Sequence, residues 1–238
     1  MLPADMPPKP GGWRQLGLDL TPAPHFRRED FLVSEANATA LRMIEAWPSW
    51  PDDVLLLVGP PGAGKSHLAA IWAARAAADV SFGRMLEGAD LAALAGKPAL
   101  VIEAADEIGA AEATLFHLLN LARQQRTSLL LTARRKPDLW GLATADLVSR
   151  LRLAPLVELG APDDALLKAV LRKLFRDRQL IVDAAVLEFV ALHLDRSLDM
   201  ARYFVDLLDR AALARGRPVT RVLARELLQG FGGDDEQA

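Results

Sequence analysis

The chain has 238 residues, with a net charge of −3, a pI near 5.8, 51% hydrophobic and 25% charged residues, and no cysteine. This composition is typical of a soluble globular protein with one large domain or a large and a small one, and it excludes disulfide bonds and thiolate zinc sites. No apolar run approaches the roughly 18 residues of a membrane helix, and the lack of a basic excess argues against a protein that grips DNA directly. We therefore expect a cytoplasmic protein with no membrane contact and only indirect contact with DNA.

The N-terminal residues are rich in proline and show little periodicity, which predicts a flexible arm over residues 1–30. Within this arm, Gln15 is followed by three spaced leucines, Leu16, Leu18 and Leu20. An apolar groove on a partner can capture such a peptide, because the amide hydrogen-bonds at one end while the leucines fill pockets. The same leucines also alternate as in a β-strand, so the alternative is a strand folded back onto the chain's own domain.

The next part of the chain, residues 31–160, reads as an α/β domain. Continuous apolar runs at Val54–Val58, Pro98–Ala104 and Ser128–Ala133 alternate with helical stretches. Strands that are apolar throughout are buried on both faces, as in a parallel sheet covered by helices on both faces.

Beyond residue 160 the sequence changes character, because amphipathic helical segments follow one another without further strand-like runs. Their periodicity predicts a small all-helical domain over residues 161–232. Residues 233–238 read as a solvated tail. No helix-turn-helix pattern follows this helical domain in the sequence, which agrees with the expectation of only indirect contact with DNA.

One eight-residue segment matches the phosphate-loop pattern G-x-x-x-x-G-K-[ST] and lies between a predicted buried strand and a predicted helix. Glycines in this pattern let backbone N–H groups converge on phosphate oxygens at the positive end of the helix. The lysine adds a charge for the β- and γ-phosphates, and the serine hydroxyl can bind Mg²⁺. The sequence therefore predicts that ADP or ATP is held by Gly59, Pro60, Pro61, Gly62, Ala63, Gly64, Lys65 and Ser66.

Hydrolysis of that nucleotide depends on acids at the end of a second buried strand. Glu103 stands where the acid that holds Mg²⁺ together with Ser66 is expected, but the next residue, Ala104, cannot orient water. Asp106 and Glu107 follow in a turn, where helix-capping or solvated charges are the favoured interpretation. We therefore predict tight nucleotide binding with slow turnover by the isolated chain.

These segments together resemble the AAA+ ATPases of the DnaA type, most closely the DnaA-related regulators of the Hda type. The resemblance rests on EDFLVSEANATAL, GPPGAGKSHLA and LFHLLNLARQQRTSLLLTARRKP, in this order and spacing. It implies an AAA+ domain followed by an all-helical lid. It also implies that Val33, with Asn37, lies near the adenine, that His67 belongs to the phosphate loop, and that Thr132 senses the γ-phosphate.

The segment DLVSRL matches the stretch that carries the family's arginine finger, which assigns that role to Arg150. Such a guanidinium enters a neighbouring subunit's site and stabilises charge on the γ-phosphate. The alternative is an arginine solvated at a helix end. The family's lid arginine has no direct counterpart, because the best registers put Asp199 or Met200 at its position, with Arg196 and Arg202 on either side. Either one of these arginines substitutes or the lid contact is missing.

The resemblance also implies partners. Gln15, Leu16, Leu18 and Leu20 are similar to the motif with which Hda-type regulators bind the DNA polymerase III sliding clamp. The implied function is a negative regulator of replication initiation that, tethered to the clamp, stimulates ATP hydrolysis by DnaA, with a homo-oligomer possible. The alternatives are a helicase-loader-like AAA+ adaptor, a small-molecule kinase, and a clamp-binding protein with a vestigial nucleotide site.

Overall fold

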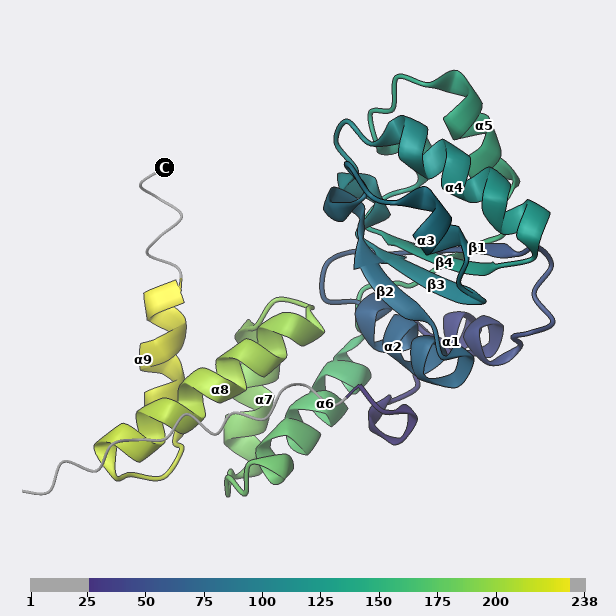
Figure 1. Cartoon of the computed structure of the whole chain (residues 1–238). Coiled ribbons are helices and arrows are strands. Elements are labelled where there is room, and N and C mark those ends of the chain that lie inside the picture. The colour runs from purple at the N-terminus through teal and green to yellow at the C-terminus, as the bar shows by residue number, and fades with distance from the viewer. Residues whose placement is uncertain (1–25, 232–238) are drawn as a thin grey trace, which may run out of the picture.

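The computed structural model describes residues 26–231, apart from the side chains of Ala92, Ala95 and Phe231 (Figure 1). The predicted clamp-binding residues and the predicted tail lie outside the described residues. Within them, no helix combines the length and the hydrophobicity that a membrane crossing requires.

A five-stranded sheet forms the centre of the larger part, in the order β2-β3-β4-β1-β5. Every neighbouring pair is parallel. The three central strands are the apolar runs of the sequence, and their residues are almost entirely buried because helices cover both faces. The strands are β1 (Val54–Val58), β2 (Asp79–Phe82), β3 (Ala99–Glu103), β4 (Ser128–Ala133) and β5 (Leu156–Glu158).

Two layers of helices cover the sheet, as the sequence predicts. Side chains of β1 alternate between them: Leu55 and Leu57 join the core under one layer, whereas Leu56 joins the core under the other. The first layer is α1 (Ala38–Glu45) and α2 (Lys65–Ala76), and the second is α3 (Leu91–Ala95), α4 (Glu112–Gln125) and α5 (Ala145–Leu153).

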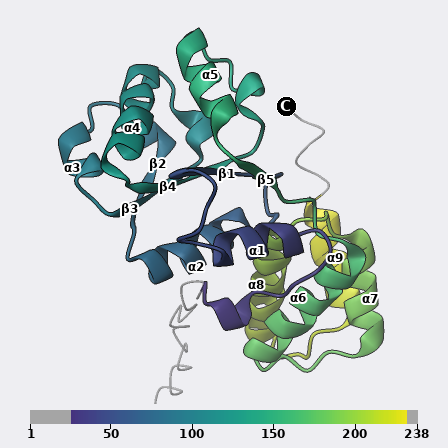
Figure 2. The ribbon, with the colours of Figure 1, turned by 90° about the vertical axis from the view of Figure 1, so that its right-hand side faces the viewer.

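A separate helical part follows the sheet and has its own apolar core. Side chains of Asp163, Asp183 and Ser197 accept hydrogen bonds from backbone N–H groups in the first turns of three of its helices, which fixes where those helices begin. Figures 1 and 2 show this part beside the α1–α2 layer, away from α3–α5. It consists of α6 (Asp164–Asp177), α7 (Ala184–His193), α8 (Leu198–Arg215) and α9 (Arg221–Phe231).

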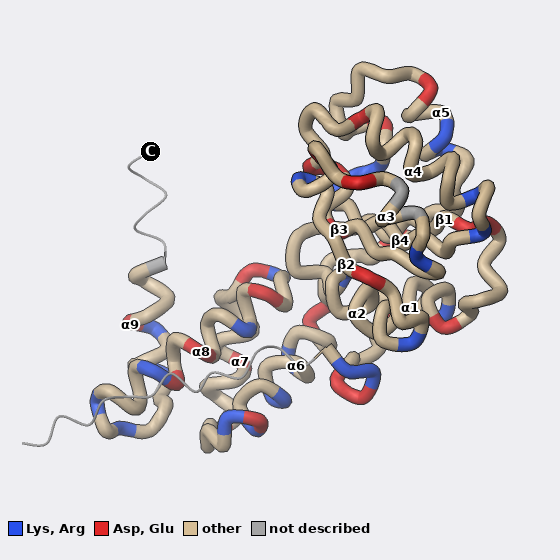
Figure 3. The backbone as a smooth tube through the Cα atoms, viewed as in Figure 1, with Lys and Arg blue, Asp and Glu red and all other residues tan. Residues whose placement is uncertain are grey.

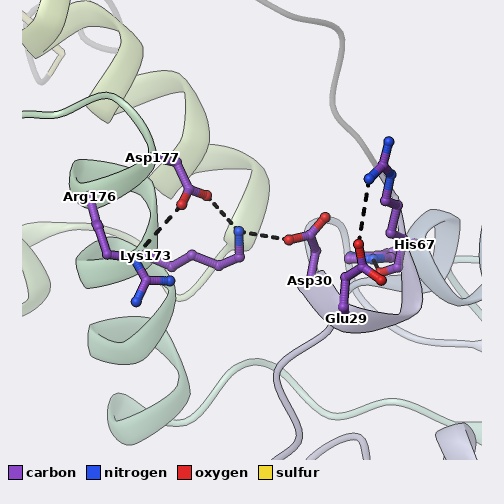
Figure 4. A network of polar contacts seen from close by, with 7 residues as sticks. Glu29, Asp30, His67, Lys173, Arg176 and Asp177 are labelled. Atoms are coloured by element: carbon purple, nitrogen blue, oxygen red, sulfur yellow. Dashed lines mark hydrogen bonds and ion pairs between the residues drawn. The ribbon is translucent and has the colours of Figure 1, made fainter.

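The segment before α1, residues 26–31, which we call the leading segment, ties the two parts together (Figure 4). Lys173 of α6 bonds Asp30 of this segment at 2.8 Å and Asp177 at 2.5 Å. The hydrogen bond from Lys173 holds the pKa of Asp30 below its usual value, although burial opposes the effect. For Lys173, burial acts to lower the pKa, but the bonds to Asp177 and Asp30 outweigh this effect, and the net result is a raised pKa.

Charged residues of both signs are interspersed over both parts of the described chain (Figure 3). No long basic stripe of the kind that follows a nucleic-acid backbone runs across the described residues in this view. This distribution agrees with the net charge of −3.

Candidate nucleotide-binding site

A cavity of about 200 Å³ lies where the two parts of the molecule meet. Its lining comes from the phosphate loop and the start of α2, the carboxyl ends of β3 and β4, helix α8 and the leading segment. Ligands of open parallel sheets bind at this carboxyl edge, where loops and helix N-termini converge. The cavity is therefore the candidate nucleotide site.

The phosphate loop takes a conformation that only glycine accepts at two positions. Gly62 and Gly64 have φ angles of 68° and 101°, in the left-handed region. Gly62 also contacts the helical part: its carbonyl oxygen accepts the Leu198 N–H at 2.8 Å, and an ideal Cβ would lie 1.9 Å from Ser197 Oγ. The loop leads directly into α2, whose first turn has no side-chain cap among residues 26–231, so its N–H groups can bind an anion.

Lys65 lines the cavity at the first position of α2. Its Nζ donates to the carbonyl oxygens of Gly59 and Pro60 at 2.6 and 2.8 Å. Burial lowers the pKa of Lys65, and the nearby carboxylate of Asp106 opposes this lowering more than any other charge. A phosphate group would give the ammonium a stronger, charge-assisted acceptor than the two carbonyls.

Ser66, Glu103 and Thr132 form a connected group at the ends of α2, β3 and β4. Glu103 Oε2 accepts the Ser66 hydroxyl at 2.9 Å and the Thr132 hydroxyl at 3.0 Å. These hard oxygen donors suit Mg²⁺, which takes its remaining ligands from water and nucleotide phosphates. The described residues hold no group of three His, Asp or Glu that could bind a metal without such help.

Ala104, directly after Glu103, has φ at 50°, in the left-handed region, and its N–H donates to Thr132 Oγ1 at 3.0 Å. The chain then turns so that Asp106 lines the cavity. Reasoning from the sequence favoured a capping or solvated role for Asp106. One feature of the sequence could have identified Asp106 as a cavity residue: its position just beyond the carboxyl end of a buried strand.

His67, the residue after the phosphate loop, is buried between two aromatic rings. The ring centroids of Phe26 and Phe31 each lie 5.1 Å from the His67 ring, and His67 Nε2 bonds the Arg27 carbonyl oxygen at 2.8 Å. Burial lowers the pKa of His67. Arg202 of α8 lies over the Phe26 ring, 5.3 Å from its centroid, so Phe26, which the sequence did not single out, meets the cavity, α2 and the helical part.

Of the two arginines expected to replace the lid arginine, only Arg202 lines the cavity. Arg196 instead pairs with Asp164 at 2.9 Å. Asp199 also lines the cavity and accepts a hydrogen bond from Arg202 at 3.1 Å. The helical part therefore presents one cation and one acid to the cavity.

The two residues expected near the adenine, Val33 and Asn37, lie in the segment just before α1. Val33 is 53% exposed and does not line the cavity. The buried Asn37 organises its own turn, because its amide oxygen accepts the Ser34 N–H at 2.9 Å and its amide nitrogen donates to the Leu32 carbonyl at 3.0 Å.

Arg150 lies in the last turn of α5, where its side chain is exposed. It does not line the cavity of its own chain, and it has no hydrogen-bond or ion-pair partner among residues 26–231. Arg152 on the same helix differs, because its Nε donates to Asp138 Oδ1 at 2.7 Å. The Arg150 guanidinium is thus available to a neighbouring molecule.

No protein-family model and no curated protein sequence matches this chain. Among solved structures, domain III of the Thermotoga maritima replication initiation protein DnaA superimposes with a TM-score of 0.76 at 22% identity, covering 88% of this chain and 98% of that one. AMPPCP-bound DnaA from Aquifex aeolicus gives 0.68 at 19% identity, with 78% and 65% covered. The Thermotoga maritima RuvB Holliday junction branch migration motor gives 0.69 at 22% identity, with 90% and 74% covered. The chain therefore has the AAA+ fold that domain III of DnaA and RuvB share.

Proposed function

We propose that this chain is a regulator of replication initiation of the Hda type, which promotes ATP hydrolysis in a DnaA partner. The observation that carries the proposal is the position of Arg150, exposed on α5, outside its own cavity and without a partner in the described part of the chain. An arginine that served only its own fold would be expected to hold an acid or a carbonyl, as Arg152 does.

The chemical role of Arg150 follows from charge. As the γ-phosphoryl group transfers to water, negative charge spreads over its oxygens and the leaving oxygen. A guanidinium supplied from outside stabilises this charge in the transition state more than in the ground state, so it accelerates the chemical step by about 10³- to 10⁵-fold in systems that use such a finger. The bond broken belongs to the partner's nucleotide.

The chain's own nucleotide, ADP or ATP, supports this role as a ligand that joins the two parts. Lys65 and the N-terminus of α2 would hold phosphates, Ser66 and Glu103 would hold Mg²⁺, and Arg202 would contact the nucleotide from the helical part. The same cavity is lined from both parts, so an occupied site favours one arrangement of α8 against the phosphate loop.

The arm supplies the tether in this proposal. Gln15, Leu16, Leu18 and Leu20 bind the DNA polymerase III sliding clamp, which holds the protein beside DNA in the cytoplasm without direct DNA contact. An exposed finger also permits homo-oligomers, in which one copy offers Arg150 to the next.

The experiment follows DnaA-bound ATP over time in the presence of clamp-loaded DNA. Arg150→Ala should abolish the stimulation at every concentration, and Arg150→Lys should restore little of it, because an ammonium lacks the planar bidentate geometry. Leu16→Ala with Leu18→Ala should weaken stimulation at low concentration but recover at high concentration, because only the tether is lost.

Arg152→Ala is the matched control on the same helix. It removes an exposed ion pair and should leave the stimulation close to that of the unaltered chain. If Arg150→Ala stimulates as well as the unaltered chain does, the finger assignment fails and a clamp-binding protein with a vestigial nucleotide site takes its place.

A further inference from the structure

The nucleotide cavity contains an acid with an unused oxygen. Asp106 Oδ2 accepts the Arg134 N–H at 3.1 Å, which fixes the carboxylate against the end of β4. The other oxygen, Oδ1, is buried and has no hydrogen-bond partner in the described chain, although the side chain lines the cavity. A buried carboxylate oxygen without a donor is unfavourable, so a donor is expected when the site is filled.

The neighbouring acids already have partners. Glu103 Oε2 accepts hydroxyl hydrogen bonds from Ser66 and Thr132. Glu107 does not line the cavity, because it is turned toward Arg134 and pairs with its guanidinium at 2.8 Å. Asp106 is therefore the acid of this loop that both lines the cavity and has a buried oxygen without a hydrogen-bond partner in the described chain.

The charges around Asp106 restrict what the missing donor can be. Lys65 and Asp106 both line the cavity, and the Asp106 carboxylate is the charge that most opposes the lowering of the Lys65 pKa, so Asp106 lies near the ammonium that would hold the terminal phosphates. A carboxylate repels a polyphosphate in direct contact, and the two are compatible when a molecule that donates to both lies between them. Water is such a molecule.

We propose that Asp106 orients the water that attacks ATP in this chain's own site, in place of residue 104, so that the chain is itself a slow ATPase. The water oxygen forms a bond to the γ-phosphorus while the bond from that phosphorus to the β–γ bridging oxygen breaks. ADP keeps the electron pair of the broken bond, hydrogen phosphate is released, and the remaining water proton passes to solvent. Asp106 accepts a hydrogen bond from the attacking water and aligns its lone pair.

This activity goes beyond the proposed regulation of a partner, and it rests on that proposal only for the binding of ATP. Neither the clamp nor DnaA takes part in it. Ala104 carries only a methyl group, so the alignment of water comes from the turn that the left-handed Ala104 introduces before Asp106.

The test uses the full chain alone, with Mg²⁺ and labelled ATP, at several protein concentrations. Asp106→Asn should lower the hydrolysis rate about 100-fold, because a neutral amide is a weaker acceptor for the attacking water than a carboxylate, while the Kd for ADP stays within about twofold. The matched control, Glu107→Gln, keeps an acceptor for Arg134 and should change neither quantity.

A second readout does not depend on turnover. ADP with aluminium fluoride imitates the transferring phosphoryl group and its attacking water, so the unaltered chain should bind this complex more tightly than ADP. Asp106→Asn should lose that gain, and Glu107→Gln should keep it.

Three results would overturn the assignment. Asp106→Asn hydrolyses ATP at the unaltered rate; or it loses hydrolysis and ADP affinity together, as a merely structural residue would; or the unaltered chain shows no hydrolysis above the protein-free rate at any concentration. None of these outcomes depends on DnaA, so each leaves the proposal for Arg150 to its own experiment.

Discussion

Gly62 is a single residue on which both the phosphate loop and the attachment of the helical part depend. Its φ of 68° is strained for any residue with a Cβ, and its surroundings leave no room for one, since Ser197 Oγ lies 1.9 Å from the ideal Cβ position. Gly141 offers a comparison within the same chain, because it has φ at 73° but nothing within 4 Å of that position. A comparison of the two glycines therefore separates the cost of backbone strain from the cost of disturbing the contact with α8.

Replacement of each glycine by alanine should therefore have different effects. Gly141→Ala should lower the free energy of unfolding by about 1–2 kcal/mol, from the left-handed backbone alone. Gly62→Ala should lower it further and also weaken ADP binding at least about tenfold, because the loop or Ser197 must shift. Urea unfolding and titration with fluorescent ADP measure both quantities, and equal losses in the two variants would contradict the role of the α8 contact.

His67 gives a prediction about pH. Its pKa is lowered in the folded chain by burial, so the unfolded chain binds the proton more readily. The stabilisation from neutral His67 is complete above an unfolded pKa of about 6.5 and is lost as the pH falls from there toward the folded value, by up to about 1.4 kcal/mol per pH unit. Urea unfolding at pH 7.5, 6.5 and 5.5 should show a steeper decline for the unaltered chain than for His67→Gln, and parallel declines would contradict the prediction.

At the scale of elements, the contact between the leading segment and α6 should be stronger than an ordinary surface ion pair. The side chains of Lys173 and Asp30 are 22% and 27% exposed, against 49% and 57% for the pair of Lys97 and Asp79 at the sheet edge. Partial burial reduces screening by water and salt, so the coupling free energy should be larger for Lys173 and Asp30 than for Lys97 and Asp79.

A double-mutant cycle with Lys173→Ala and Asp30→Ala should give a coupling free energy of about 1 kcal/mol that persists at high salt. The same cycle on Lys97 and Asp79 should give a coupling close to zero. Thermal or urea unfolding provides the values, and a coupling at Lys173 no larger than at Lys97 would mean that the leading segment does not anchor α6.

The strands show which elements of the sheet a sequence pattern can predict. The three central strands are continuous apolar runs, because both of their faces meet helices, and this made them readable from the sequence. Strand β2 lies at the edge, where Val80 is 52% exposed, and β5 has three residues, so neither carries the pattern of a buried strand. The conformation of an edge strand is set by pairing with the neighbouring strand rather than by its own composition.

The site residues likewise divide into those that the sequence identified and those that it did not. The phosphate loop and Glu103 are contiguous patterns whose chemistry depends on spacing, and sequence reasoning found them. Phe26 and Asp106 contact residues distant in sequence, Phe26 with Arg202 and Asp106 with Arg134. No local pattern marks Phe26, and only its place just beyond a buried strand marks Asp106. Such contacts become visible when the fold brings the leading segment, α8 and the end of β4 to one place.

For the molecule as a whole, the nucleotide should bind across two parts that otherwise meet through few contacts. Mg²⁺ with ADP at about 100 times its Kd should stabilise the folded chain by about 2.7 kcal/mol and raise Tm. Lys65→Ala should show almost no such shift, and Arg202→Ala a reduced one, because the helical part then loses its cation toward the ligand. Differential scanning fluorimetry with and without Mg²⁺–ADP measures the shift, and an unchanged response in Arg202→Ala would remove α8 from the binding site.

The position of Phe26 at the nucleotide cavity limits how far from that cavity a partner bound by the arm can lie. Five residues separate it from Leu20, a stretch that spans at most about 22 Å even when fully extended. A partner bound at residues 15–20, as we propose, would therefore be tethered within about 22 Å of a residue that lines the nucleotide cavity. The contacts of Phe26 with His67 and Arg202 thus set where the arm leaves the described part of the chain, beside the cavity.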